Sequence, residues 1–496
     1  MTRAAWLQSV FRALTGPTLQ SEPRAARRVK PSSLPAEIRL LEARTLLSGL
    51  AVEQQATTSA LSPVFAEEFN TGAVITRTRT DASQARVIAP GEGSLRPGTQ
   101  LSGNGLQFNL VAAPAMSQQA IDGFQEAADL WSSILRDDIM VNIDIDFTVL
   151  GTGILGSTGS TSQGNNLTSV RNALTADAKS LSDASAVANL PSGSTLSLYT
   201  SNPTTGAAEL DNNATGNNST LDINTANAKA IGLLSASNSA SDGSITFSSL
   251  FTWDFDRSDG IAQGAFDFVG VAAHEIGHLL GFVSGADVVD ATSHNGSSAP
   301  LSLDPFRVVS TLDLFRYSSA SETAGADIDV RADTATKYFS IDGGATQLTT
   351  FSTGSANGDG RQCSHWKDNL NIGIMDPTAA PAEYTDITNF DVQAFDVMGW
   401  DVAMDQGDSP DTGSGTGTGN YSTNLADNGP RHLLFSASGS ITDPSGAPKV
   451  YLGAGVTGEL AALQNSTATG DVDNGITSLP ALVPGTTQNF TVTSTG

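Results

Sequence analysis

Residues 268–283, FVGVAAHEIGHLLGFV, form the segment that most limits how this chain can fold. Apolar residues flank a short polar motif on both sides, so we expect a buried helix over residues 268–282 with Asp267 as its N-cap. A buried glutamate between two histidines needs a partner that offsets its lost solvation, and a metal ion is such a partner. The segment therefore predicts a metal site inside the fold.

The motif itself is His274-Glu275-Ile-Gly-His278. Residues four apart lie on one face of a helix, so both imidazoles can reach one Zn²⁺ at about 2.0–2.1 Å. Zn²⁺ lowers the pKa of water that it binds towards about 7, and Glu275 is placed to accept the proton. His274 and His278 are therefore the predicted zinc ligands, and Glu275 is the predicted catalytic general base.

A catalytic zinc site needs a third protein ligand and an open position for water. Together with Gly281, the motif reads H-E-x-x-H-x-x-G and resembles the metzincin family of zinc peptidases. In the short form of that pattern the third ligand would stand at Ser284, which is a poor zinc ligand. Three other residues are candidates for the third ligand: Asp287, His294 and His365.

His365 lies in Ser-His-Trp, and Met375 follows ten residues later in Gly-Ile-Met-Asp-Pro. This arrangement resembles the leishmanolysin-type metzincins, in which a large insertion separates the helix from the third histidine and a methionine turn follows. The resemblance implies that His365 is the third zinc ligand and that Met375 lies beneath the metal as an apolar floor. Asp287 stays the alternative third ligand, and His294 is expected in an exposed loop.

The order of predicted elements favours an α+β fold with a zincin- or metzincin-like catalytic domain and a small C-terminal β module. We expect the catalytic cleft between an upper half that contains the sheet and an irregular lower half, with a peptide lying along an edge strand. Strands are predicted at 106–111, 140–149, 196–200, 244–251, 450–452 and 490–492, and further helices at 118–136, with Ser117 as N-cap, 169–181 and 389–398.

Composition divides the chain into five predicted segments. They are a basic N-terminal sorting segment (1–50), a loosely structured leader or pro-region (51–99), a metzincin-like catalytic domain (100–403), a flexible linker (404–420) and a partial β-rich surface-protein module (421–496). In the first segment, LEARTLLSG (41–49) resembles the LEPR-x-LL sorting segment of bacterial surface and exported proteins, with Ala43 in place of the proline. A basic amphipathic helix is expected around 36–47.

The last segment resembles repeat units that precede and begin GEVED-type domains of bacterial surface proteins. The resemblance lies in GDSPD (407–411), DNGPRH (427–432), YLGAG (451–455), ATGD (468–471) and LVPG (482–485). It implies association with a cell surface, and the module is expected to continue past Gly496 in the natural chain. The sequence from about 100 to 401 also looks like a group of bacterial exported metallopeptidases.

Charge and composition exclude several partners. The chain has 25 Lys+Arg and 51 Asp+Glu, a net charge of −26, although residues 1–44 are basic. An acidic body repels nucleic acid and anionic membranes, so neither is an expected partner. There is one cysteine, Cys363, so no internal disulfide can form, and no apolar run is long enough to predict a membrane span. DFDRSDG (254–260) has carboxylates that a calcium loop could use, with a solvated turn as the alternative.

These observations together predict an extracellular or surface-located bacterial zinc endopeptidase that acts on polypeptides. The alternative from another class is a catalytically inert, metal-binding surface or adhesion protein.

Overall fold

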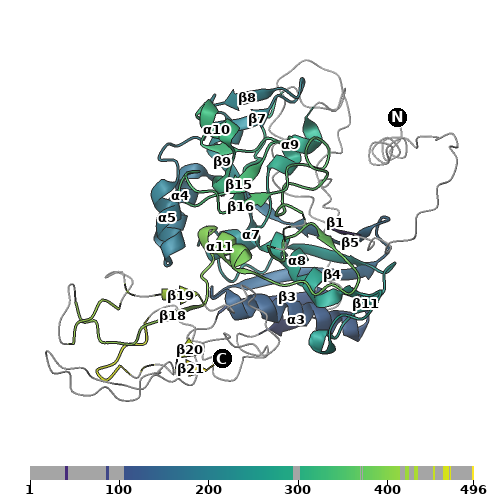
Figure 1. Ribbon diagram of the computed structural model, residues 1–496, viewed down its shortest axis with the longest axis vertical. Helices are drawn as coiled ribbons and strands as arrows, with labels where there is room; N and C mark the ends of the chain where they lie inside the picture. Colours follow the sequence, from purple (N-terminus) through teal and green to yellow (C-terminus); the bar gives the residue numbers. More distant parts are fainter. Residues whose placement is uncertain are drawn as a thin grey trace, which may run out of the picture. The chain divides into compact units, whose positions relative to one another are not determined.

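The protein is described by a computed structural model (Figure 1). It describes residues 105–114, 116–293, 302–368, 370, 372–413, 419–423, 429, 431–433, 451–452, 462–468, 470 and 494–495, together with strands at 39–42 and 85–88. The chain divides into the units Met1–Glu37 and Ile38–Gly496, and the first lies outside the described residues.

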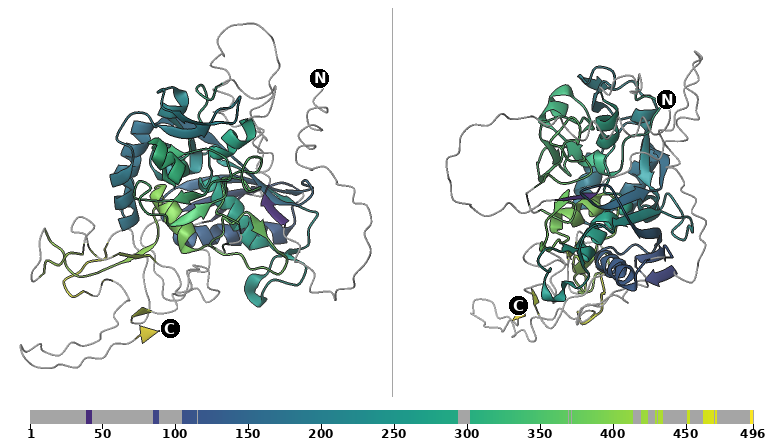
Figure 2. Two further views of the ribbon diagram at one scale, coloured as in Figure 1. Left: turned by 45° about the horizontal axis from the view of Figure 1, so that its top comes forward. Right: turned by 90° about the vertical axis from the view of Figure 1, so that its right-hand side faces the viewer.

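A seven-stranded mixed sheet is the largest in the described part of the chain. Its strand order is β17 (Thr378–Ala379), β1 (Arg39–Glu42), β5 (Ile154–Ser160), β10 (Gly243–Ser248), β4 (Met140–Thr148), β3 (Gln107–Ala112) and β2 (Ala85–Ile88). Strands β3, β4 and β10 are parallel, and β5 runs antiparallel to β10. On its other side β5 pairs in parallel with β1, which pairs antiparallel with β17 (Figure 2, where β1 is the purple arrow).

Helices lie around this sheet and between several smaller sheets. The helices are α3 (Gln118–Ile134), α4 (Leu167–Asp177), α5 (Leu181–Asn189), α6 (Gly216–Ser219), α7 (Thr225–Ala230), α8 (Phe268–Leu280), α9 (Ala286–Thr292), α10 (Ser319–Ala324) and α11 (Asn389–Val397), with 3-10 turns at Arg257–Asp259 and Leu312–Phe315. The other strands are β6 (Ser162–Asn166), β7 (Leu198–Ser201), β8 (Ala208–Asp211), β9 (Thr220–Asn224), β11 (Trp253–Asp254), β12 (Phe266–Asp267), β13 (Arg316–Tyr317), β14 (Ile328–Asp329), β15 (Lys337–Phe339), β16 (Thr349–Phe351), β18 (Met404–Gln406), β19 (Arg431–Leu433), β20 (Tyr451–Leu452) and β21 (Ser494–Thr495). The fold is therefore mixed α and β, in agreement with an α+β class.

Helix α8 lies at the centre of the hydrophobic core. All 13 of its residues are buried, and it packs against both α3 and β5. Phe268 at its N-terminal end contacts Phe124 of α3 and Phe247 of β10, with ring centroids 5.3 and 4.7 Å apart. A helix in which most residues are apolar on every side is stable inside such a core. The polar residues of α8 therefore face other protein groups instead of water.

Most predicted elements lie where the sequence placed them. The side chain of Ser117 caps α3 by accepting a hydrogen bond from the backbone N–H of Ala120, as expected. The single helix predicted over 169–181 is wrong, because α4 ends at Asp177 and Ser180 caps a second helix, α5. A serine in this position offers the backbone an N-cap that competes with continuation of the preceding helix.

The helix expected around 36–47 is also wrong, since residues 39–42 form strand β1. Strand pairing on both sides of β1 is a tertiary interaction that overrides local helix preference. The predicted strand 490–492 and His294 lie outside the described residues, and strand 450–452 corresponds to β20.

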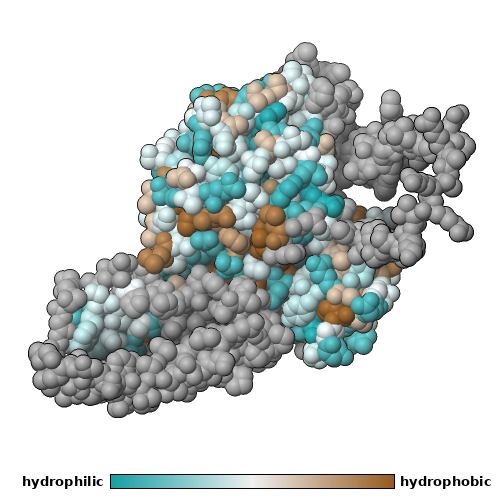
Figure 3. Space-filling view, viewed as in Figure 1, coloured by the Kyte–Doolittle hydropathy of each residue, from teal (hydrophilic) through white to brown (hydrophobic). Residues whose placement is uncertain are grey.

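The face of the molecule in Figure 3 is mainly polar, with several separate apolar patches among the described residues. Large exposed apolar side chains include Val149, Leu181, Leu250 and Leu370; Leu181 belongs to α5, and the other three lie outside the helices and strands. Apolar residues scattered in this way are ordinary on a folded surface.

Candidate metal centre

Three histidine side chains meet at one point in the core. His274 and His278 come from α8, and His365 comes from a loop 87 residues beyond His278 in the chain. The Nε2 atom of His278 lies 3.1 Å from that of His274 and 3.2 Å from that of His365. All three residues are buried, with at most 2% of their surface exposed. The structure thus brings together the three histidines that the sequence nominated as ligands.

Each of the three rings is oriented by a backbone carbonyl at its Nδ1 atom. The acceptors are the carbonyls of Ile374 for His274 at 2.6 Å, Phe282 for His278 at 2.7 Å and Gln362 for His365 at 3.2 Å. A carbonyl carries no proton, so each Nδ1 must be the donor. In the neutral ring Nε2 then holds a lone pair, and the three lone pairs converge.

Converging lone pairs repel one another unless a cation lies between them. Three neutral imidazoles could therefore hold one metal ion here, and the carbonyl at each Nδ1 would fix ring orientation as in known histidine metal sites. Imidazole suits several transition metals, so the donor set does not identify the ion by itself.

The ends of α8 are set by the residues that flank it, and side chains from α3 and β9 bond to its carbonyls. Asp267 caps the helix by accepting a hydrogen bond from the N–H of Gly270 at 3.0 Å. Gly281 ends it with φ 129°, a conformation that glycine adopts without strain. Two further contacts hold helix carbonyls: the indole N–H of Trp131 bonds to Ala273 at 2.8 Å, and the amide of Asn224 bonds to His278 at 2.8 Å.

Glu275 lies against strand β5. Its Oε2 atom accepts a hydrogen bond from the hydroxyl of Thr158 at 2.6 Å, and both residues are buried. Gly156, two residues earlier on the same strand, leaves room for the carboxylate, since a Cβ atom there would overlap Oε1 of Glu275. Neither β5 residue was predicted from the sequence, because a threonine and a glycine in a strand carry no signal of a contact with a distant helix.

Met375 lies directly against α8 at Gly277. Its Sδ atom would be 2.6 Å from a Cβ atom at Gly277, so only glycine at that position allows the sulfur to approach the helix this closely. The turn that carries Met375 is held by Asp391, whose carboxylate accepts hydrogen bonds from the backbone N–H of Ile374 at 2.9 Å and the indole of Trp366 at 2.8 Å. Burial raises the pKa of Asp391 to about 6.

Asp287 is close to the histidines in the fold, but its contacts are with the loop that carries His365. Its carboxylate accepts hydrogen bonds from the N–H of Cys363 at 2.5 Å, and from both the N–H and the hydroxyl of Ser364. The group of potential ligand atoms includes His365 and not Asp287. The observed contacts of Asp287 are those of a residue that orients the third histidine, whereas His294 lies outside the described residues.

The acidic turn proposed for calcium makes local hydrogen bonds. Asp254 accepts from the N–H groups of Asp256 and Ala262, and Asp256 accepts from Ser258. Within the part of the chain that the structure describes, the three histidines are the one group of three side chains placed to share an ion. The turn therefore supplies no calcium site of three carboxylates in the described structure.

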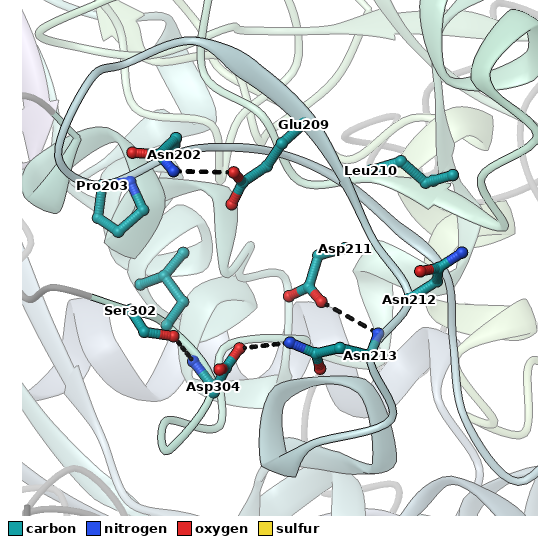
Figure 4. A pocket seen from close by; sticks show the side chains of 10 residues that line it. Asn202, Pro203, Glu209, Leu210, Asp211, Asn212, Asn213, Ser302 and Asp304 are labelled. Carbon is teal, nitrogen blue, oxygen red and sulfur yellow. Dashed lines mark hydrogen bonds between the residues drawn. The ribbon is translucent and has the colours of Figure 1, made fainter.

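A separate polar pocket lies near β8 (Figure 4). Its wall includes Glu209, which accepts a hydrogen bond from Asn202 at 2.9 Å, and Asp304, which accepts one from Asn213 at 2.9 Å. The pocket shares no residue with the histidine group. Its carboxylates already accept hydrogen bonds from neighbouring amides, as Figure 4 shows.

Comparisons of the chain with protein-family models, with curated proteins and with solved structures find no match. None of the helices in the described residues is both long and apolar enough to cross a membrane.

Proposed function

We propose that this chain is a zinc-dependent endopeptidase, with His274, His278 and His365 as zinc ligands and Glu275 as general base. The observation that carries the proposal is the convergence of three imidazole Nε2 atoms beside a glutamate on the same helix. Three histidines and an open position are a ligand set that catalytic zinc uses in proteins.

The spacing of the nitrogens supports zinc. Ligands about 2.0–2.1 Å from a tetrahedral zinc ion lie about 3.3 Å from one another. The observed Nε2 separations from His278 are 3.1 and 3.2 Å, close to this value. Met375 against Gly277 supports the assignment of an apolar floor in a metzincin-like site.

The position of the site relative to the sheet supports a peptide substrate. Helix α8 packs against β5, and Glu275 contacts two residues of that strand. An extended peptide can add to a strand edge through main-chain hydrogen bonds. In the proposed complex the scissile bond would lie over Glu275, with the peptide along β5 on the side where β1 pairs.

In the proposed reaction, bound zinc would lower the pKa of water and polarise the scissile carbonyl. Glu275 takes the proton from the attacking water and then donates it to the leaving amine, so one carboxylate serves both proton transfers. The carbonyls at Nδ1 of the histidines keep the rings oriented throughout.

The decisive experiment compares wild type with Glu275→Gln and with Glu209→Gln, a glutamate of the separate polar pocket. Zinc content is measured by atomic emission, and cleavage is measured on casein and a peptide library. The wild type and Glu209→Gln should bind one zinc ion and cleave, and Glu275→Gln should keep zinc while kcat/KM falls by at least about 10²-fold. Strand β1 occupies the edge of β5 at which the peptide would add. Leu40→Pro, which should free that edge, is therefore assayed beside wild type as a second form that should cleave.

If both wild type and Leu40→Pro bind zinc but cleave nothing, an inert metal-binding surface protein becomes the better proposal. Export to the cell surface is part of the proposal, and it depends on the sequence resemblances of segments 1–50 and 421–496.

A further inference from the structure

Strand β5 holds the side chain of Glu275 at two points. The hydroxyl of Thr158 is 2.6 Å from Oε2 of Glu275 and 3.0 Å from its backbone carbonyl oxygen. A threonine hydroxyl has one proton, and the shorter distance favours donation to the carboxylate, because charge-assisted hydrogen bonds are the shorter and stronger ones.

The second point is Gly156. Residues i and i+2 of a strand face the same side, so Gly156 and Thr158 present one surface to the glutamate. A Cβ atom at Gly156 would overlap Oε1 of Glu275, which shows how closely the carboxylate lies against the strand backbone. One carboxylate oxygen is thus held by a hydroxyl, and the other lies over a residue without a side chain.

We propose that Thr158 is a positioning residue for the general base, and that Gly156 provides the space in which the positioned carboxylate lies. This inference rests on the proposed peptidase function for its kinetic consequence. A glutamate side chain has three rotatable bonds, and proton transfer requires its oxygen within hydrogen-bond reach of the reacting water. Thr158 selects one orientation of the carboxylate before the substrate binds.

The location of Thr158 gives this positioning a second consequence. Thr158 is paired with Ile245 of β10 and lies two residues from the point where Gly156 pairs with β1. The strand that would receive the peptide is therefore the strand that orients the base. The distance between the peptide backbone and the carboxylate is then set within one rigid element, and a misplacement of about 1 Å can reduce catalysis about 10²-fold.

The test uses Thr158→Val, which keeps the shape and removes the hydroxyl, and Thr158→Ser, which restores the hydroxyl. Thr161→Val is the matched control, because the Thr161 hydroxyl bonds to Ser241 and not to α8. All variants are made in the full chain, and the same four measurements are taken: zinc content, thermal midpoint, kcat and KM. Thr158→Val should lower kcat about 10- to 100-fold with unchanged KM and zinc content, Thr158→Ser should recover most of kcat, and Thr161→Val should match wild type.

A structural readout makes the test independent of turnover. In crystals of zinc-loaded Thr158→Val the Glu275 carboxylate should leave the position that it has in wild type, and in Thr158→Ser it should keep that position. Gly156→Ala should displace it as well, which provides a second variant if Thr158→Val folds poorly. An unmoved Glu275 in Thr158→Val, or a kcat of Thr158→Val equal to that of a wild type that cleaves, overturns the inference.

The two proposals fail in different ways. If zinc-loaded wild type and Leu40→Pro cleave nothing while Glu275 still moves in Thr158→Val, the peptidase proposal fails and the positioning role of Thr158 stands. If wild type cleaves and Thr158→Val cleaves equally well, the positioning role fails and the peptidase proposal stands.

Discussion

The Nε2 atoms of His278 and His365 lie 3.2 Å apart, although 87 residues separate them in the sequence. The contact is possible because the loop before Trp366 is held against the segment that follows α8. Asp287 accepts hydrogen bonds from the N–H groups of Cys363 and Ser364, which brings the next residue, His365, over the helix. The third potential ligand is thus placed by a buried carboxylate and not by its own helix.

This relationship predicts that substitutions of His365 and of Asp287, the two candidates for the third ligand, change zinc affinity to different extents. His365→Ala should lose zinc on dialysis, because two imidazoles cannot complete the site. Asp287→Asn should keep zinc but bind it about 10- to 100-fold more weakly, which is the usual effect of removing a residue that orients a ligand. Both are measured by competition with a chromophoric chelator.

His294→Ala is the control, since the alternative histidine should leave zinc affinity unchanged. The reverse pattern, with zinc lost in Asp287→Asn or His294→Ala and kept in His365→Ala, would contradict the assignment of the third ligand.

The contact between Met375 and Gly277 predicts an unusual effect of alanine in a helix. Gly→Ala inside a helix normally stabilises by about 1 kcal/mol. Gly277→Ala should instead destabilise by about 1–3 kcal/mol, because its Cβ would meet the Met375 sulfur at 2.6 Å. Urea unfolding measures the change.

A double-mutant cycle identifies the contact. In a Met375→Ala background the space is open, so the cost of the Gly277→Ala substitution should fall by at least about 1 kcal/mol. Equal costs in both backgrounds would show that the sulfur is not the group that the new methyl meets.

The position of strand β1 predicts that this strand lowers the peptidase activity of the full chain. Leu40 pairs with Ile154 of β5 and with Thr378 of β17, so β1 lies along the edge where the proposed peptide would add. Proline inside a strand with partners on both sides removes a ladder hydrogen bond, and for this reason it is confined almost entirely to edge strands. Leu40→Pro should therefore raise kcat/KM on a fluorogenic peptide more than about tenfold.

Arg86→Pro is the matched control, because β2 lies at the opposite end of the same sheet and pairs with β3 alone. It should leave kcat/KM close to the wild-type value. Equal activation by both prolines would point to general loosening of the sheet and would count against competition at β5.

Asp177 predicts how stability depends on pH. It is the last residue of α4, and burial together with the charge of Asp401 raises its pKa to about 7, while Lys179 acts in the opposite direction. The folded state therefore holds this proton more tightly than the unfolded chain. The stabilisation that comes from binding this proton is fully present below about pH 4 and is lost as the pH rises through 7. The free energy of unfolding therefore falls over that range.

Asp177→Asn removes the negative charge from a helix C-terminus. It should raise the free energy of unfolding by about 1 kcal/mol at pH 8, less at pH 5 and not at all near pH 3, after allowance for partial solvent screening. Urea unfolding followed by tryptophan fluorescence gives the values, with the exposed Asp122→Asn as control. A gain that does not depend on pH would rule out titration of Asp177 as the cause.

The sequence alone determined the helix that carries His274, Glu275 and His278, its Asp267 cap and its burial. Those properties follow from the order of neighbouring residues, because helix periodicity places residues four apart on one face and an apolar segment has to be buried. The same local reasoning located β3, β4, β10 and α3 to within a few residues, but it joined α4 and α5 into one helix and missed strand β1.

Only the tertiary structure decided which distant residue completes the histidine group. Sequence separation says nothing about distance in space. The family resemblance favoured His365 and left Asp287 as the alternative, and the fold places His365 in the group and Asp287 behind its loop. The contacts of Thr158 and Gly156 with Glu275 are of the same kind. These contacts join a strand to a helix more than 100 residues later in the chain, and local sequence patterns do not predict contacts over such a separation.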